Sequence, residues 1–483
     1  MKYITSILRK KQFLCMLMVA IWLIGCVQED FTPFPEKPGK SISFALTVSD
    51  VDIPSVSSRS MIGSEGGYKE DEVQNVDILV FDASKTPAMF LEWVEVKSTA
   101  ITQTLNGTTA TATFSAPLTP TNGKTCIMIV ANRPTDVESY KNILAGFKKG
   151  ETTKVDAVEA MVHIGNPWQW PTDGPNDNGK YLPIPMCGEK EVDKIAPSME
   201  PIGDISLKRM LARIDIVNST SNFTVDVAYL VNYNNAGYVA PVWDANGKID
   251  LTATGTNIPA GSDQKVGVDV ANRHPINGNT SYKGGIYTFE APAAVDAGGA
   301  DEDGDTSRKD AVCLIIGGKR VGDVSTTFYR VDFTKVGGVG EAVKYLPLLR
   351  NHKYVIDITE VSGIGYEGNK EALESYTMLS NLKMRLITYD RDKVKDVVYD
   401  GQYMLGVGKS EIEVTQFQNN SYVVDVFTDV PGGWKATAVS DNDWLKFDDG
   451  EGNGGLTTMG QANEDTQIKL RVPFFTEGAQ IGD

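Results

Sequence analysis

The sequence predicts a nearly all-β protein that contains two tandem β-sandwiches and a smaller third β unit. Residues 41–49 alternate between large apolar and small polar side chains, which is the pattern of a half-buried strand. Apolar runs recur at residues 126–130 and 311–316, and Asn-Gly pairs at residues 106–107 and 122–123 supply turn signals around them. Together these features favour packed sheets over helices.

The first block is expected to span residues 41–205. It has four predicted strands, at residues 41–49, 76–81, 109–114 and 126–130. In the first of them, one face carries the large apolar side chains, Ile42, Phe44, Leu46 and Val48. A single helical segment is expected at residues 149–161.

The second block is expected to span residues 206–405, with strands at residues 206–217, 223–231, 311–316 and 351–359. The run at residues 124–132 resembles the run at 309–317, and both are apolar on their two faces. Each run therefore predicts a central strand, at a similar place in its block, which indicates two sandwiches of related design.

Residues 409–483 are expected to form the third, smaller unit. Its predicted strands lie at residues 410–414, 421–428, 434–438, 444–447 and 467–472. Trp434 and Trp444 are expected in its core, because so small a unit needs large aromatic side chains for stability. No further apolar strand follows residue 472, so one sheet edge is expected to lack a partner.

The first 26 residues have the pattern of a bacterial lipoprotein signal. Basic side chains precede the twelve apolar residues 13–24, and Leu-Ile-Gly-Cys closes the segment at residues 23–26. Twelve apolar residues fall short of the roughly 20 that span a bilayer, which argues against a transmembrane anchor. Residues 1–25 are therefore the predicted signal peptide, Cys26 is the predicted lipidation site, and residues 26–40 form a linker. The acidic residues that follow Cys26 resemble the export tag of Bacteroidetes surface lipoproteins.

Charge and cysteine content agree with an exported protein. Removing residues 1–25 takes away four of the 46 basic residues and none of the 63 acidic ones, which leaves a net charge of −21. Such a chain repels nucleic acid and anionic lipid headgroups. Beyond residue 26, three cysteines remain without a Cys-x-x-Cys spacing, so neither a disulfide framework nor a zinc site is indicated. Cys126 and Cys313 lie in apolar runs and are expected to be buried.

The sequence contains no convincing catalytic or metal-binding motif, so we expect neither an enzyme nor a cofactor. The three histidines, His163, His274 and His352, are isolated from one another and from any nucleophile motif. The acidic residues 301–305 do not match a complete calcium-binding loop, because Gly304 is out of register for the EF-hand pattern. Trp168 and Trp170 lie in a polar loop where they either stack on a sugar or peptide ring or cap a sandwich.

Several sequence motifs occur along the chain in an order that is typical of one protein family. They are the lipoprotein signal, the strand at residues 41–49, and the segments 76–82, 129–132, 211–215 and 349–354. In this order they resemble the fimbrillins of Bacteroidales type V pili, the FimA-type family, over about residues 26–405. The resemblance implies two transthyretin-like β-sandwich domains, transport to the cell surface as a lipoprotein, cleavage after the first strand by an arginine-specific protease, and assembly by strand exchange. From residue 401 onward the sequence departs from this pattern and resembles a BACON-type domain.

Arg59 and Ser60 lie in a polar segment after the first strand, and we expect cleavage between them to detach residues 41–49 together with the lipid. The chain is thus predicted to be a structural or adhesive subunit of a surface fimbrium, in a tip or accessory position. Its expected partners are other fimbrial subunits, a surface glycan or protein ligand, and the outer membrane before maturation, but no nucleic acid. Two alternatives remain: a surface glycan-binding lipoprotein that never polymerises, and a fimbrial anchor in which Arg59 stays uncut.

Overall fold

The computed structural model describes most of the chain from residue 41 onward. The described ranges are 41–49, 70–106, 109–133, 137–165, 183–196, 201–241, parts of 258–293, 311–335, 344–375, 382–390 and parts of 396–472. Within them, strands predominate, which confirms the predicted all-β fold class. None of the described helices is long and apolar enough to cross a membrane.

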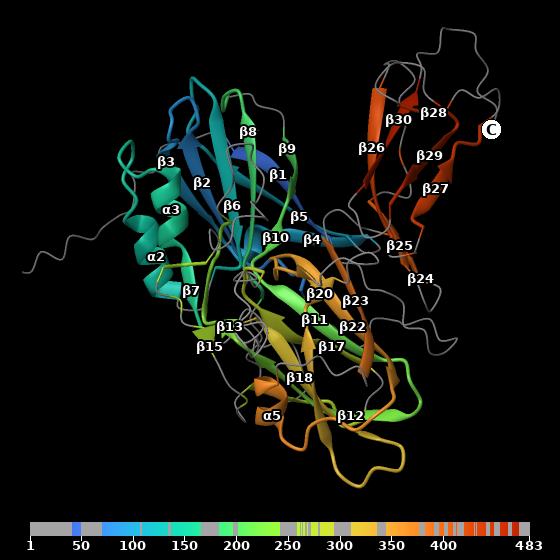
Figure 1. The fold of residues 1–483 in the computed structure, drawn as a ribbon. Coiled ribbons are helices and arrows are strands. Elements are labelled where there is room, and N and C mark those ends of the chain that lie inside the picture. The colour runs from blue at the N-terminus through green and yellow to red at the C-terminus, as the bar shows by residue number, and fades with distance from the viewer. Residues whose placement is uncertain are drawn as a thin grey trace, which may run out of the picture. The chain divides into compact units, whose positions relative to one another are not determined.

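Two facing sheets form the first sandwich (Figure 1). The β1 sheet contains, in spatial order, β4 (Thr102–Asn106), β5 (Thr109–Pro117), β1 (Ser41–Ser49) and β9 (Ile202–Ser206). The β2 sheet contains β10 (Lys208–Arg209), β8 (Met186–Val192), β6 (Thr125–Ala131), β2 (Val76–Asp82) and β3 (Met89–Val96). The predicted strands at residues 41–49, 76–81, 109–114 and 126–130 all lie in this sandwich.

The strand β2 is buried on both of its faces, whereas the strand β1 is buried on only one face. In β2, Ile78 and Val80 face the core between the two sheets. The alternate residues Leu79 and Phe81 belong to a second core, which the helices cover. Because side chains alternate along a strand, a strand covered on both faces needs a continuous apolar run, and β2 has one.

Two helices cover the outer face of the β2 sheet, α2 (Val137–Ala145) and α3 (Lys154–Ala160). The single helix expected at residues 149–161 is therefore too long, because the chain forms turns before Thr153 caps the N-terminus of α3. The sequence analysis missed α2. Tyr140 and Leu144 from α2 pack with Phe81 and other residues of the second core.

The second sandwich is built from two four-stranded sheets around one core. One sheet contains β17 (Ser281–Thr288), β11 (Ala212–Asn218), β22 (His352–Val361) and β23 (Leu382–Asp390). The other contains β16 (Arg273–Pro275), β12 (Phe223–Val231), β18 (Cys313–Arg320) and β19 (Thr327–Asp332). As predicted, the two similar apolar runs form inner strands, since β6 lies between β8 and β2, and β18 lies between β12 and β19.

The strand expected at residues 206–217 is wrong as a single element. This stretch contributes β9 to the β1 sheet, β10 to the β2 sheet and β11 to the second sandwich. The chain changes sheets at Leu207, whose amide donates to the Thr47 carbonyl at 2.9 Å, and again at Met210, whose amide donates to the Pro185 carbonyl at 2.9 Å. The stretch looks like one strand in sequence because Leu207, Met210 and Leu211, which lie at or beside the two sheet changes, are buried apolar residues.

The C-terminal part forms a five-stranded and a two-stranded sheet. The larger sheet contains β24 (Asp396–Tyr399), β25 (Met404–Val407), β26 (Asn420–Thr428), β30 (Thr466–Val472) and β28 (Lys446–Phe447), and the smaller pairs β27 (Trp434–Thr437) with β29 (Thr457–Gly460). The half-buried Trp434 donates from Nε1 to Thr466 Oγ1 at 2.8 Å. Trp444 and almost all of the strand expected at residues 410–414 lie outside the described residues.

Shorter elements complete the described fold. They are η1 (Ser98–Ala100), β7 (Val162–Ile164), β13 (Tyr233–Asn234), β14 (Ala236–Tyr238), β15 (Gln264–Lys265), β20 (Thr334–Lys335), β21 (Lys344–Tyr345) and α5 (Asn369–Glu374). The pair β7–β14 joins a strand that follows α3 to a strand that follows β12. The core beneath the helices also includes Tyr287 and Phe289, which lie at and just beyond the end of β17.

Candidate functional site: the first strand and its groove

The strand β1 is an inner strand of its sheet, although it comes from the beginning of the described chain. It pairs antiparallel with β5 along its whole length, from Ser41 opposite Pro117 to Ser49 opposite Thr109. On its other side it pairs parallel with β9, where Phe44 lies opposite Ile202 and Thr47 lies opposite Ser206. Figure 1 shows β1 in blue beside the green β9. Both backbone edges of β1 are therefore engaged.

One face of β1 is almost completely removed from solvent. The exposed fractions of its apolar side chains are 4% for Ile42, 2% for Phe44, 0% for Leu46 and 0% for Val48. The Phe44 ring stacks on the Phe114 ring of β5, with centroids 5.1 Å apart. Burial of four such side chains contributes about 6–12 kcal/mol, at roughly 1.5–3 kcal/mol each. The strand thus fills a groove whose walls are β5 and β9.

Only the segment of residues 50–69 links β1 to the rest of the fold on its C-terminal side. Neither β5 nor β9 is a sequence neighbour of β1. A cut anywhere between residues 50 and 69 therefore turns β1 into a separate peptide, held only by non-covalent contacts. The groove would then be open to any strand of matching apolar pattern.

Where the described chain resumes, Glu70 is fixed in a buried polar cluster that we call the Glu70 clamp. Glu70 Oε1 accepts hydrogen bonds from Arg213 Nη1 and from the Tyr287 hydroxyl, both at 2.8 Å. The Glu70 carbonyl also accepts from Arg209 Nε at 2.9 Å. The side chain of Glu70 is 0% exposed and that of Arg213 is 2% exposed. Charge-assisted hydrogen bonds in such a buried setting are strong.

The clamp continues into the second sandwich. Arg213 of β11 donates from Nε and Nη2 to the two carboxylate oxygens of Asp215, at 2.8 and 3.0 Å. Lys353 of β22 places Nζ 3.2 Å from Asp215 Oδ2. Sequence reasoning missed this cluster, because the hydrogen-bond partners of Glu70 lie 139 to 217 residues further along the chain. The only available signal was the occurrence of charged residues within the apolar run at residues 206–217.

A second buried charge lies on the helix-covered side of β2. Asp77 Oδ1 accepts from Trp93 Nε1 at 2.9 Å, and Asp77 Oδ2 lies 3.2 Å from Arg133 Nε. Burial raises the pKa of Asp77 to about 6, and the nearby Arg133 guanidinium only partly offsets this effect. The carboxyl group therefore titrates near neutral pH.

Several residues singled out from the sequence lie outside the described residues, so their proposed roles stay predictions. They are Cys26, Arg59, Ser60, Trp168, Trp170 and the acidic segment 301–305. The four apolar residues of β1 are described, and they are buried on one face as the alternation predicts.

The histidines occupy three different environments. The ring of His163 lies against Phe289, His274 Nδ1 is 3.4 Å from the Tyr282 hydroxyl, and His352 Nδ1 is 2.9 Å from the Arg350 carbonyl. Burial lowers the pKa of His274 to about 4. Within the described ranges, no group of three or more His, Cys, Asp or Glu side chains could hold a metal ion.

The cysteines behave as the sequence predicts. Cys126 and Cys313 are free and buried, as is Cys187. Burial raises the pKa of the Cys126 thiol to about 12, so this thiol is protonated at neutral pH.

No protein-family model matches the chain, and neither does any curated protein sequence. Among solved structures it is similar to the tip fimbrial protein Mfa3 of Porphyromonas gingivalis, at 14% identity and a TM-score of 0.40, over 72% of this chain and 99% of that one. It is also similar to a fimbrial assembly protein of Parabacteroides distasonis, at 13% identity and a TM-score of 0.39, over 67% and 92%. A third structure is a candidate cell adhesion protein of Bacteroides eggerthii, at 18% identity and a TM-score of 0.38, over 74% and 98%.

Proposed function

We propose that this protein is a structural and adhesive subunit of a cell-surface fimbrium, and that β1 is a placeholder strand which another subunit replaces during assembly. The protein would be exported as an outer-membrane lipoprotein precursor that carries its lipid on Cys26. The observation that carries the proposal is the position of β1. It is an inner strand, buried on one face, whose two neighbours are far away in the sequence.

Replacement requires a competitor, because β1 is stably held. Its four buried side chains contribute about 6–12 kcal/mol, so cleavage alone would leave it in the groove. A donor strand from another subunit can offer the same ladder to β5 and β9 and equivalent apolar side chains. Exchange then keeps the backbone hydrogen bonds and the core intact at every stage after insertion.

Cleavage after Arg59 is the step that would make β1 exchangeable. It would release β1 and the lipid as one peptide and leave Ser60 as the new N-terminus. The Glu70 clamp would still hold the chain ten residues beyond the cut, since Arg209, Arg213 and Tyr287 all lie C-terminal to it. The body could therefore lose β1 without loosening the connection at Glu70.

A tip or accessory position is the form of this function that we favour. The chain continues beyond β23 into the C-terminal sheets, β24 to β30, which would have to be accommodated beside any neighbouring subunit. An additional unit of this kind fits more easily at the end of a fibre than within a repeating stalk. A membrane-anchor subunit would instead retain β1 and stay uncut at Arg59.

The proposal is tested by treating the purified precursor with a trypsin-like protease and sequencing the new N-terminus. We expect one early cut after Arg59, with the fragment that contains β1 remaining bound through gel filtration. A fluorescent peptide of residues 41–49 should then enter slowly as the original fragment leaves. A control peptide with Phe44→Ser and Leu46→Ser should fail to enter.

The Arg59→Ala variant tests the step in cells, with Lys69→Ala as the matched control in the same segment. The Arg59→Ala protein should reach the surface with its lipid and stay out of fimbriae, while Lys69→Ala should assemble normally. Normal assembly of Arg59→Ala would remove cleavage at this residue from the mechanism and favour the anchor alternative.

A further inference from the structure

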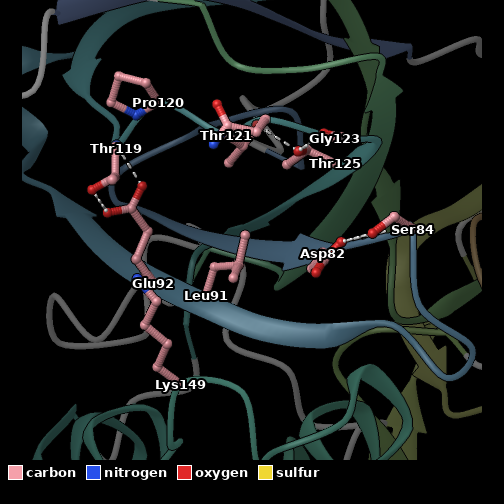
Figure 2. Close-up of a pocket in the computed structure, with 11 residues that line it drawn as sticks. Asp82, Ser84, Leu91, Glu92, Thr119, Pro120, Thr121, Gly123, Thr125 and Lys149 are labelled. Atoms are coloured by element: carbon pink, nitrogen blue, oxygen red, sulfur yellow. Dashed lines mark hydrogen bonds between the residues drawn. The ribbon is translucent and has the colours of Figure 1, made fainter.

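A cavity of about 400 Å³ opens in the first sandwich, away from the histidines and the Glu70 clamp. Its lining comes from the end of β2, from β3, from the connection between β5 and β6, and from the turn before α3. Figure 2 shows the side chains that line it. Volumes of roughly 300–1,000 Å³ are usual for pockets that bind small molecules.

One wall is shaped by a β-bulge. The register of β3 against β2 shifts between Val80 and Phe81, which leaves Leu91 as the extra residue opposite them. Leu91 and the neighbouring Glu92 both line the cavity. Bulges commonly re-aim side chains in this way.

The carboxylate of Glu92 is fixed by two hydrogen bonds, and both of its oxygens can still accept more. Its Oε1 accepts from the Thr119 amide and its Oε2 from the Thr119 hydroxyl, each at 2.7 Å (Figure 2). Each carboxylate oxygen has two lone pairs, so each of these oxygens can accept a further hydrogen bond. The position of the acceptor pair is thus set before any ligand arrives.

Asp82 supplies a second carboxylate. Its Oδ1 accepts from the Ser84 amide at 3.1 Å and from the Ser84 hydroxyl. The hydrogen bond from Ser84 lowers the pKa of Asp82 below its ordinary value, so this carboxyl is ionised at neutral pH. Lys85 Nζ lies 3.7 Å from Asp82 Oδ2.

The remaining lining is hydroxyl-rich, with two small apolar surfaces and one amine. Thr121 and Thr125 share a hydrogen bond of 2.7 Å, Leu91 and Pro120 are apolar, and the exposed Lys149 contributes an ammonium group. None of the described residues that line the cavity is aromatic. This mixture selects against flat aromatic ligands, and the two carboxylates repel anions.

We propose that this cavity binds one neutral sugar residue, such as the terminal pyranose of a surface glycan. The sugar hydroxyls would donate to Glu92 and Asp82 and accept from Lys149, while a C–H face of the ring packs on Leu91 and Pro120. A cationic side chain fits less well, because Lys85 already lies beside Asp82 and Lys149 adds a positive charge to the lining. The proposal is independent of strand exchange and names a site for recognition rather than assembly.

The test is saturation-transfer NMR on the full precursor with methyl glycosides of glucose, galactose and mannose and with N-acetylglucosamine. We expect transfer from at least one of them at about millimolar concentration. Asp82→Asn and Lys149→Ala should each weaken binding about tenfold, since each removes one charged hydrogen-bond partner. Glu151→Gln and Lys148→Ala are matched controls, because these exposed residues pair with each other and do not line the cavity.

Three results would overturn the proposal. One is the absence of transfer from all four sugars. Another is binding that Asp82→Asn and Lys149→Ala leave unchanged, which would locate the sugar elsewhere. The third is preferential binding of Nα-acetyl-lysine methylamide, whose ε-ammonium group is free, because this would make the cavity a site for a basic peptide side chain. Asp82 and Lys149 are partly or fully exposed, so thermal melting should verify that both variants fold normally.

Discussion

At the level of single residues, side chains on the two faces of β1 should contribute very differently to the free energy of unfolding. Leu46 is 0% exposed within the core between the two sheets, whereas Ser43 is exposed and makes one hydroxyl hydrogen bond, with Ser115 at 3.0 Å. Leu46→Ala should therefore lower the free energy of unfolding by about 2–5 kcal/mol. Ser43→Ala should change it by less than about 0.5 kcal/mol. Urea unfolding of the intact precursor measures both, and equal effects would mean that β1 is not packed as described.

Asp77 makes stability depend on pH in an unusual direction for a carboxyl group. Its pKa is about 6 in the folded protein and 3.8 in the reference state, so the folded protein binds this proton more tightly. Its contribution is fully present below pH 3.8 and is lost as the pH rises through 6. Wild type should thus lose about 1.4 kcal/mol from this group between about pH 5 and 7.5.

The Asp77→Asn variant isolates this contribution, because asparagine can still accept from Trp93 and does not titrate. Urea unfolding at the two pH values should show the variant gaining about 1.4 kcal/mol relative to wild type on going to the higher pH. A difference between variant and wild type that stays constant with pH would show that Asp77 is ionised throughout.

At the level of elements, local patterns predict strands well and their partners poorly. The alternation at residues 41–49 predicts both the bounds of β1 and the face that it buries. It says nothing about β5 and β9, because strand pairing between distant segments leaves no local trace. The cavity proposed to bind a sugar is also hidden from sequence patterns, since Asp82, Glu92 and Thr119 come from three segments that only the fold brings together. Periodicity at Tyr140 and Leu144 could have revealed α2.

The Glu70 clamp connects the residue at which the described chain resumes to β10, β11 and β17, and its contribution to stability can be measured. Glu70→Gln removes the negative charge that faces Arg213 and should lower the free energy of unfolding by about 2–3 kcal/mol. Tyr287→Phe deletes one hydrogen bond to the same carboxylate and should cost about 1 kcal/mol. The exposed Glu374 at the end of α5 provides a control, since Glu374→Gln should stay within about 0.5 kcal/mol of wild type. If Glu70→Gln is as stable as this control, then the charge of Glu70 does not contribute to the stability of the fold.

At the level of the whole molecule, the proposed lipid would place an acidic body at a surface. Cys26→Ser removes the thiol that the proposed lipid requires, and the variant should accumulate as an uncleaved, unlipidated precursor inside the cell. Surface labelling and mass measurement would follow it, with Cys126→Ser as a control that leaves Cys26 in place. A Cys26→Ser protein that reaches the surface in normal amount would argue against the lipoprotein route.

The position of β1 between β5 and β9 also determines when the β1 sheet can be completed during synthesis. The first sandwich cannot complete its β1 sheet until residues 202–206 have left the ribosome, because β9 is one of the two neighbours of β1. Closing so long a loop carries an entropic cost, and folds dominated by distant contacts form slowly. We therefore expect the β1 sheet to close late during synthesis. If the chain is exported as proposed, it would cross the membrane before this sheet has formed.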